Sequence, residues 1–344
     1  MMKEFLNNFQ SPILLDCTIR DGGYAINFQF SARDTRNICT NLDKSGIRMI
    51  EVGHGLGLGA SNPSNGIAFE SDEDYISTAK SVAKNAFIGA FFIPGIGKKE
   101  DIKKAKDAGL DFIRIGKDVT DLSVTRDFID YSLGLDLHVS LNMMKSYAVS
   151  ALELGNIINN IKAWGVDAIC LVDSAGCMLP EQISEYVTVI RENSDSPVGF
   201  HGHNNLGMAN ANSLAALKGG AKFVDATLRG MGRSAGNAQT EAMAFIFQEY
   251  GYDVNLDPFL LLEMSENIIE PLMLYPQGLS SMDIVIGISK FHSGHLPRFK
   301  RILKKYDIDL RKLIIGVSKV NCINPSDELI ESVAKDLARI DEFS

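Results

Sequence analysis

The sequence is poor in features that define several classes of protein. It has five cysteines in 344 residues, an odd number, and no Cys-x-x-Cys pair. We therefore expect reduced thiols in a cytoplasmic protein and no disulfide scaffold. Residues 1–12 contain no apolar stretch of the signal-peptide type. The longest apolar stretch, residues 86–97, is too short for a membrane span and is interrupted by Pro94. Contact with a membrane is not expected.

Positive charge is also scarce. Lys and Arg number 34 against 43 Asp and Glu, which gives a formal net charge of -9. This balance argues against a nucleic-acid partner. The most basic run, residues 298–305, alternates with apolar residues as in an amphipathic helix, so it is interpreted as a solvated face or a subunit contact. Hydrophobic residues at 45% and charged residues at 22% are ordinary for a globular enzyme.

Short apolar runs alternate with helical patterns along the first 230 residues. The eight runs predicted as strands are residues 13–18, 47–53, 86–92, 111–116, 135–142, 167–173, 197–203 and 222–228. The predicted helices are residues 31–45, starting at an N-cap Ser31, and 100–108, 148–164, 180–193 and 205–218. Glycines at 46, 109, 165 and 219 are expected to end four of them.

Eight such units are the number needed for a closed (β/α)₈ TIM barrel. The competing fold is a doubly wound open sheet, which concentrates its functional groups at one switch point. Here polar and ionisable residues follow many different strands, so the barrel is favoured. From residue 257 onwards the pattern is helical. We therefore expect a catalytic barrel over residues 1–250 and a C-terminal helical region over residues 251–344.

Two strand ends carry residues with metal-binding chemistry. His201 and His203 are two residues apart on a predicted strand, so their side chains point to the same side. Asp21, after the first strand, would complete a set of two imidazoles and a carboxylate for a divalent cation. Arg20 beside it is placed to hold a substrate oxyanion. The alternative for Arg20 and Asp21 is an ordinary surface turn, because Asp-Gly-Gly is a common turn sequence.

Other strand ends carry further candidates. Glu51 is a candidate ion-pair partner of Arg20 or a substrate contact, and His54 is either a substrate contact or a loop histidine. Ser174 is a candidate for binding a carboxylate, or is the N-cap of the helix that includes Pro180. Asn237, in a glycine-rich loop after the eighth strand, is expected near the metal.

Four segments carry a resemblance to a known family. LLDCTIRDGGY (residues 14–24) resembles the D-x-T-x-R-D-G signature of the DRE-TIM metallolyases, and residues 201–241 resemble their H-x-H segment with its glycine-rich loop. Residues 50–61 and the tail segment 287–309 resemble one branch, the 4-hydroxy-2-oxovalerate aldolases.

This resemblance implies a TIM barrel that holds Mn²⁺, Mg²⁺ or another divalent cation through Asp21, His201 and His203, with Asn237 approaching it. It also implies that Arg20 stabilises an enolate oxygen and that Ser174 helps to hold the carboxylate of a 2-oxo acid. The branch typically pairs through its C-terminal region with an acylating aldehyde dehydrogenase. Such a partner, or a second copy of this chain, is therefore a candidate.

One position departs from the family pattern. The aldolases carry a histidine as general base three residues after the metal aspartate, where this chain has Tyr24. A phenol has a reference pKa near 10 and is a poor base at neutral pH. His292 or His295, in the helical tail, is therefore predicted to replace that base.

The predicted reaction is the cleavage or formation of a carbon–carbon bond in a 4-hydroxy-2-oxo acid, through a pyruvate enolate and with an aldehyde as the other product. Two alternatives remain open. A Claisen-type acyl-CoA condensing enzyme or a hydroxymethylglutaryl-CoA lyase-like enzyme would use the same metal set on a thioester. A non-catalytic binding subunit of a dehydrogenase complex would have lost the base at Tyr24.

Overall fold

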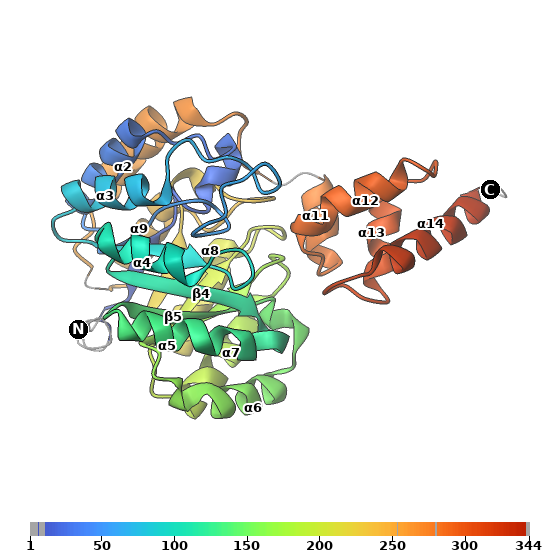
Figure 1. Ribbon diagram of the computed structural model, residues 1–344, viewed down its shortest axis with the longest axis horizontal. Coiled ribbons are helices and arrows are strands. Elements are labelled where there is room, and N and C mark those ends of the chain that lie inside the picture. Colours follow the sequence, from blue (N-terminus) through green and yellow to red (C-terminus); the bar gives the residue numbers. More distant parts are fainter. Residues whose placement is uncertain (1–5, 7–10, 253, 279–280, 342–344) are drawn as a thin grey trace.

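The computed structural model (Figure 1) describes residue 6 and residues 11–252, 254–278 and 281–341. Its centre is a closed barrel of eight parallel strands in sequence order, in which the first strand also pairs with the last. The strands are β1 (Ile13–Asp16), β2 (Met49–Glu51), β3 (Phe87–Phe92), β4 (Phe112–Asp118), β5 (His138–Met144), β6 (Ala168–Asp173), β7 (Val198–Gly202) and β8 (Phe223–Ala226). All eight predicted strands are present and the predicted TIM barrel is confirmed.

Helices cover the outside of the barrel, one after each strand. They are α2 (Ala32–Lys44), α3 (Asp72–Val82), α4 (Lys99–Asp107), α5 (Arg126–Gly134), α6 (Ala151–Ile161), α7 (Pro180–Asn193), α8 (Ala209–Gly219) and α9 (Thr240–Glu249). Short 3₁₀ turns are η1 (Gly22–Ile26), η2 (Val119–Thr125), η3 (Ser146–Ala148), η4 (Lys162–Trp164), η5 (Leu228–Gly230), η7 (Glu270–Leu272) and η8 (Ser293–His295), and η6 (Ser265–Ile269) is a π turn. The five predicted helices correspond to α2, α4, α6, α7 and α8, and no range was predicted for α3, α5 or α9.

The predicted helix ends are mostly correct. Ser31 caps α2: its hydroxyl accepts from the Asp34 amide, and its own amide donates to the Asp34 carboxylate at 2.9 Å. The end of α8 was predicted one residue too early. Gly219 is the last helical residue, and Gly220 takes the left-handed conformation with φ 99°. A side chain at Gly219 would press against the Ser184 carbonyl of α7, so this glycine serves close helix packing.

After α9 the chain continues as α10 (Pro258–Met264), α11 (Ser281–Ile288), α12 (Leu296–Leu303), α13 (Leu310–Ser318) and α14 (Asp327–Asp341). Two separate hydrophobic clusters divide this region. Leu261, Met264 and Ile269 pack in the barrel cluster, whereas α11 to α14 enclose their own core around Phe291, Phe299 and others. The packing therefore places α10 against the barrel, whereas α11 to α14 form a separate cluster. We call residues 281–341 the helical unit.

The helical unit stands at the carboxyl ends of the strands. In Figure 1, β4 and β5 end on the side that faces it. Polar contacts join the two parts: Lys145 Nζ donates to the Ile323 carbonyl at 3.1 Å, and the Ser234 hydroxyl donates to Asp283 at 2.8 Å. Within the described ranges, no helix is both long enough and apolar enough to cross a membrane.

Candidate active site

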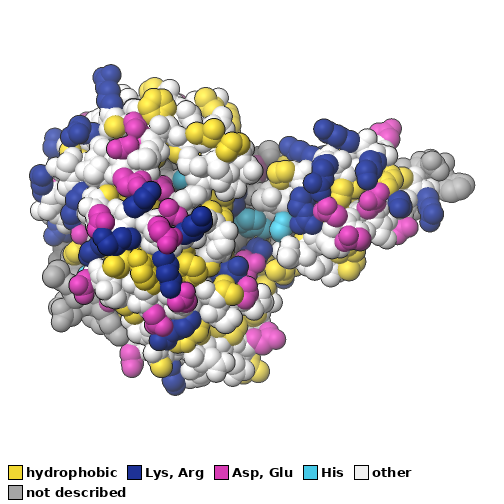
Figure 2. Space-filling view, in the orientation of Figure 1, with side chains coloured by type: hydrophobic (Ala, Val, Ile, Leu, Met, Phe, Trp, Pro, Cys, Tyr) yellow, Lys and Arg dark blue, Asp and Glu magenta, His cyan; other side chains and the backbone are white. Residues whose placement is uncertain are grey.

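A cavity of about 500 Å³ lies where the barrel meets the helical unit. Its walls come from the loops after several strands and from residues 292–297 of the helical unit. Figure 2 shows histidine side chains in the recess between the two parts. Among the lining residues are Arg20, Asp21, His201 and His203. Active sites of TIM barrels lie at this end of the barrel.

Asp21, His201 and His203 converge as the sequence predicted. One ligand atom from each lies within 4.8 Å of the others, and all three residues are buried. The Nε2 atom of His201 is 3.2 Å from Asp21 Oδ2. The convergence arises because β7 ends at Gly202, which puts both imidazoles at the barrel mouth, while the loop after β1 brings the carboxylate across from them.

The donor atoms of this cluster suit a divalent cation. His201 Nδ1 is hydrogen-bonded to Asp225 at 2.9 Å, and His203 Nδ1 lies 3.3 Å from the Gly236 carbonyl, so each ring presents Nε2 towards the cluster. Asn237 donates to the Met231 carbonyl and, at 3.3 Å, to Asp21. Its side-chain oxygen is buried and has no hydrogen-bond partner among the described residues. Two imidazole nitrogens, a carboxylate and a spare amide oxygen are ligands that Mn²⁺ and Mg²⁺ accept.

The charge states of Asp21 and His203 agree with ligand roles. Burial would raise the pKa of Asp21, but Arg20 and the two histidines hold that pKa well below its usual range. Burial lowers the pKa of His203 to about 3, so its imidazole is neutral. Burial also acts to lower the pKa of His201, but its bonds to Asp21 and Asp225 outweigh this and raise it. The site thus has an ionised carboxylate at neutral pH, as a cation requires.

A chain of buried ion pairs supports the site from below. Arg20 Nε donates to Glu51 at 2.7 Å, which confirms the expected ion pair. Arg114, from the middle of β4, contacts Glu51 at 3.3 Å and Asp225 at 2.6 Å. Asp225 in turn holds His201. Arg114 is 1% exposed, and it fixes both the arginine and one imidazole of the site. Sequence reasoning missed Arg114 and Asp225, whose only signal was a charge inside an apolar strand.

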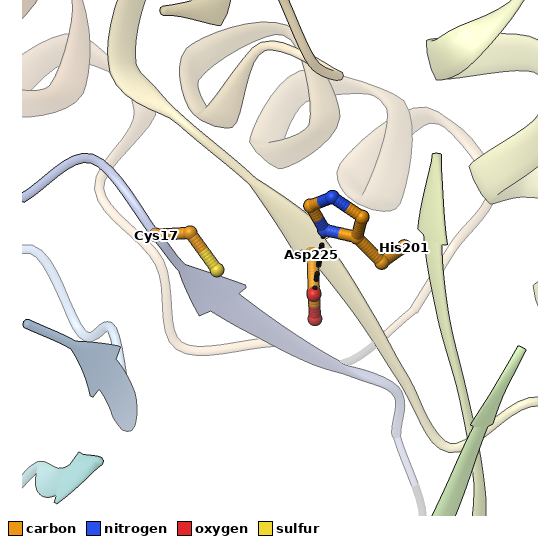
Figure 3. Close-up of side chains that lie close together, drawn as sticks. All are labelled: Cys17, His201 and Asp225. Carbon is orange, nitrogen blue, oxygen red and sulfur yellow. Dashed lines mark hydrogen bonds and ion pairs between the residues drawn. The ribbon is translucent and has the colours of Figure 1, made fainter. Parts of the chain in front are cut away.

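Figure 3 shows Cys17, Asp225 and His201 close together, with Asp225 directed at the imidazole. These three residues could also surround a cation geometrically. Burial and the nearby carboxylates raise the pKa of the Cys17 thiol well above its usual value, so it stays protonated. Asp225 Oδ2 already binds both Arg114 and His201. This cluster therefore positions His201, and Cys17 packs in the hydrophobic core of the barrel.

Two residues proposed to contact substrate lie elsewhere. Glu51 is fully buried beneath Arg20 and is not among the residues that line the cavity. His54 Nε2 contacts the Gly66 carbonyl at 3.1 Å, Nδ1 accepts from the Leu56 amide, and the ring stacks on Phe28. Both ring nitrogens of His54 thus serve its own loop. This geometry favours the alternative of a loop histidine.

Ser174 lines the cavity, and its hydroxyl accepts from the Lys145 amide at 2.9 Å. The alternative that it caps the following helix is wrong, because α7 begins after Leu179. Lys145 lines the cavity as well and is paired with Asp118 at 2.9 Å.

Tyr24, His292 and His295 all line the cavity, so the helical tail does reach the barrel mouth. Burial raises the pKa of Tyr24 above 10. Burial lowers the pKa of His292 and of His295, which keeps both imidazoles neutral. Arg233 donates to His292 Nε2 at 2.6 Å, and its guanidinium lies 5.5 Å from the centre of the Tyr24 ring. His295 Nε2 contacts the Ile323 carbonyl at 3.0 Å.

Comparison with known proteins identifies the family of the chain. The family model described as HMGL-like matches residues 11–268 of the chain. The chain is 35% identical over 325 residues to 4-hydroxy-2-oxovalerate aldolase 4 of Rhodococcus opacus, which covers 94% of each chain. It is 33% identical over 329 residues to 4-hydroxy-2-oxovalerate aldolase of Geobacillus genomosp. 3, which covers 96% of this chain and 98% of the relative.

The same fold is found in a solved structure, the carboxyl transferase domain of Rhizobium etli pyruvate carboxylase. That structure has a TM-score of 0.79 and 16% identity, and covers 97% of this chain and 62% of the solved chain. At this identity the likeness concerns the fold alone. The family match and the aldolase relatives go further: the chain belongs to the HMGL-like family, among the carbon–carbon lyases named 4-hydroxy-2-oxovalerate aldolases.

Proposed function

We propose that the protein is a divalent-metal-dependent aldolase that cleaves or forms the C3–C4 bond of a 4-hydroxy-2-oxo acid, with pyruvate and an aldehyde as the other partners in the reaction. The observation that carries this proposal is the convergence of Asp21, His201 and His203 beside the buried Arg20, in one cavity at the barrel mouth. The names of the aldolase relatives support the choice of substrate class.

In this proposal Asp21, His201 and His203 hold Mn²⁺ or Mg²⁺, with Asn237 close by. When bound, the cation supplies Lewis-acid polarisation of the 2-oxo group. Arg20 donates to the developing enolate oxygen, and Glu51 keeps its guanidinium in place through the 2.7 Å ion pair. The Ser174 hydroxyl donates to the substrate carboxylate.

The protein must also move one proton. In the cleavage direction, a base takes the proton of the C4 hydroxyl, the C3–C4 bond breaks, and its electron pair passes to C3 as the enolate. The aldehyde leaves, and the enolate is protonated at C3 to give pyruvate. We assign the base to His292 or His295, whose neutral imidazoles line the cavity.

Exchange of pyruvate methyl protons in heavy water tests the proposal, because enolate formation needs no aldehyde. We expect exchange, followed by proton NMR, in protein supplied with Mn²⁺, its loss with a chelator, and its return when Mn²⁺ is added again. Exchange by protein that elemental analysis shows to be metal-free would contradict the metal role. Exchange of acetyl-CoA methyl protons with none for pyruvate would favour a Claisen-type enzyme instead.

We also propose a cytoplasmic location and a partner for the helical unit. All five cysteines carry free thiols, which supports a reducing compartment. Helix α12 exposes Lys300 and Arg301, and Lys304 and Lys305 follow it on the surface, so this basic face is the proposed contact for an acylating aldehyde dehydrogenase or a second copy. Light scattering on the protein alone tests for a second copy, and light scattering with such a dehydrogenase present tests for that partner. A monomer in each sample would contradict both proposed partners.

A further inference from the structure

Arg233 is the cation of the cavity that lacks an acidic partner. Arg20 is balanced by Glu51 and Asp21, and Lys145 by Asp118. Across the part of the chain that the structure describes, Arg233 contacts the His292 imidazole and the face of the Tyr24 ring, and no carboxylate pairs with it. A partly buried guanidinium without a counter-charge is costly. Such a group points to an anion that arrives with the ligand.

The loop that carries Arg233 is fixed on both sides. The Arg233 carbonyl accepts from the Gly236 amide at 3.1 Å, and the Asn237 amide donates to the Gly230 carbonyl at 3.0 Å. Gln277 donates to the next carbonyl, that of Ser234, at 2.8 Å. The same short loop supplies Asn237 to the cation cluster. Arg233 is thus held at the cavity wall close to the reacting centre, so it is preorganised for binding.

We infer that the aldehyde-derived part of the substrate carries a second anionic group, a carboxylate or a phosphate, and that Arg233 binds it. This inference rests on the proposed function. In the proposed function Ser174 binds the carboxylate of the 2-oxo acid, so a second anion is needed to pair with Arg233. The cavity of about 500 Å³ also falls in the range that encloses ligands larger than a short neutral hydroxy acid.

The position of Arg233 links this anion to the proton transfer. A guanidinium can only donate, so His292 Nε2 is the acceptor in the 2.6 Å contact and its lone pair is engaged. An anion that binds Arg233 would replace His292 as the acceptor of the guanidinium. The Nε2 lone pair of His292 would then be free. Binding of the anionic aldehyde fragment would then place His292 in a state that can accept the C4 hydroxyl proton.

The test uses pairs of aldehydes that differ in charge, in the condensation direction with pyruvate and Mn²⁺. The carboxylate pair is succinic semialdehyde and butanal, and the phosphate pair is glyceraldehyde 3-phosphate and glyceraldehyde. We expect kcat/KM for the anionic member of one pair to exceed that for its neutral match by about tenfold to a hundredfold, the usual effect of one charge-assisted hydrogen bond. The pair that shows the preference identifies the anion.

The variant Arg233→Gln should abolish that preference, and Arg233→Lys should keep part of it. Arg33→Gln, which removes an exposed arginine on α2, is the matched control and should leave the preference intact. A wild-type protein that exchanges pyruvate protons but treats both members of each pair alike overturns this inference alone, as does an Arg233→Gln variant that keeps the preference. Absence of pyruvate exchange overturns the proposed function, and this inference with it.

Discussion

The barrel and the helical unit differ in what they bury. The barrel encloses ionised groups, among them Arg20, Glu51, Arg114 and Asp225, each at most 5% exposed. Among the side chains described in the helical unit, those in the buried class are apolar, such as Phe291, Phe299 and Leu313. The helical unit therefore folds around an apolar core, and none of its described charged side chains is buried. The barrel instead buries ionised groups at and beneath the candidate active site.

The buried charges of the barrel are explained by function and not by stability. Buried ion pairs are a poor source of stability, because removing two charges from water costs about as much as their attraction returns. The chain Arg20–Glu51–Arg114–Asp225–His201 is better explained by the positions it fixes, since its two ends are the arginine that we propose to bind the enolate and a candidate metal ligand. The helical unit reaches the cavity through His292, which contacts Arg233 of the barrel, and through His295, which contacts Ile323 within the helical unit itself.

The largest effect is expected from the middle of the buried chain. Arg114→Met leaves Glu51 and Asp225 without their shared partner, and should lower the free energy of unfolding by about 3–5 kcal/mol. Urea unfolding at neutral pH measures this. Arg301→Met in the helical unit is the control, because Arg301 pairs with Asp327 at an exposed surface and should lose less than about 1 kcal/mol. Equal losses in the two variants would remove the distinction between the two parts.

Arg20→Lys tests the functional end of the same chain. Lysine keeps the positive charge, but its single ammonium cannot hold Glu51 and also direct a second donor at the enolate oxygen. Turnover should fall by about a hundredfold or more, or about 3 kcal/mol, as for other lost oxyanion donors. Mn²⁺ affinity, measured by calorimetry, should change little. Unchanged turnover with weakened Mn²⁺ binding would instead assign Arg20 a structural role.

The barrel also buries Asp16, whose carboxylate accepts from the Thr240 hydroxyl at 2.7 Å. Burial raises its pKa from 3.8 to about 6, against the opposing effect of its hydrogen bonds. The folded state therefore binds the proton more tightly than the unfolded state between pH 4 and pH 6. The free energy of unfolding should accordingly fall as pH rises through this window, by up to about 3 kcal/mol.

Asp16→Asn should remove this pH-dependent fall, because an amide can still accept from the Thr18 amide and pair with the Thr240 hydroxyl in the reverse sense. Urea unfolding at pH 4, 5, 6 and 7 compares the two proteins. The curves should approach one another at pH 4, with the variant the more stable at pH 7. Parallel curves would show that Asp16 is not the group responsible.

The sequence predicted the parts of the site that lie at strand ends and missed those inside strands. His201, His203 and Asp21 could be found because spacing on a strand fixes the side to which a residue points, and the fold brings strand ends together. Arg114 and Asp225 sit among apolar neighbours in β4 and β8, where the pattern indicates core. The position of the helical unit relative to the barrel could not be predicted either, because the pattern of an amphipathic helix shows which face is buried but not which element covers that face.

The smallest effect is expected where the two parts meet. His292→Ala or His295→Ala should slow carbon–carbon cleavage about tenfold, and Tyr24→Phe should slow it less. General bases usually contribute more than tenfold, but the ring centres of the two histidines are only 5.8 Å apart, so either can partly replace the other. Burial raises the pKa of Tyr24, which leaves the phenol protonated at neutral pH, whereas it keeps both imidazoles in the neutral form that accepts a proton.

Single-turnover cleavage of a 4-hydroxy-2-oxo acid measures this step. Pyruvate proton exchange by the same variants is the control, because it involves no C4 hydroxyl. A Tyr24→Phe variant that loses cleavage, beside histidine variants that keep it, would move the base to Tyr24 and thus into the barrel. The helical unit would then shape the cavity without taking part in the chemistry.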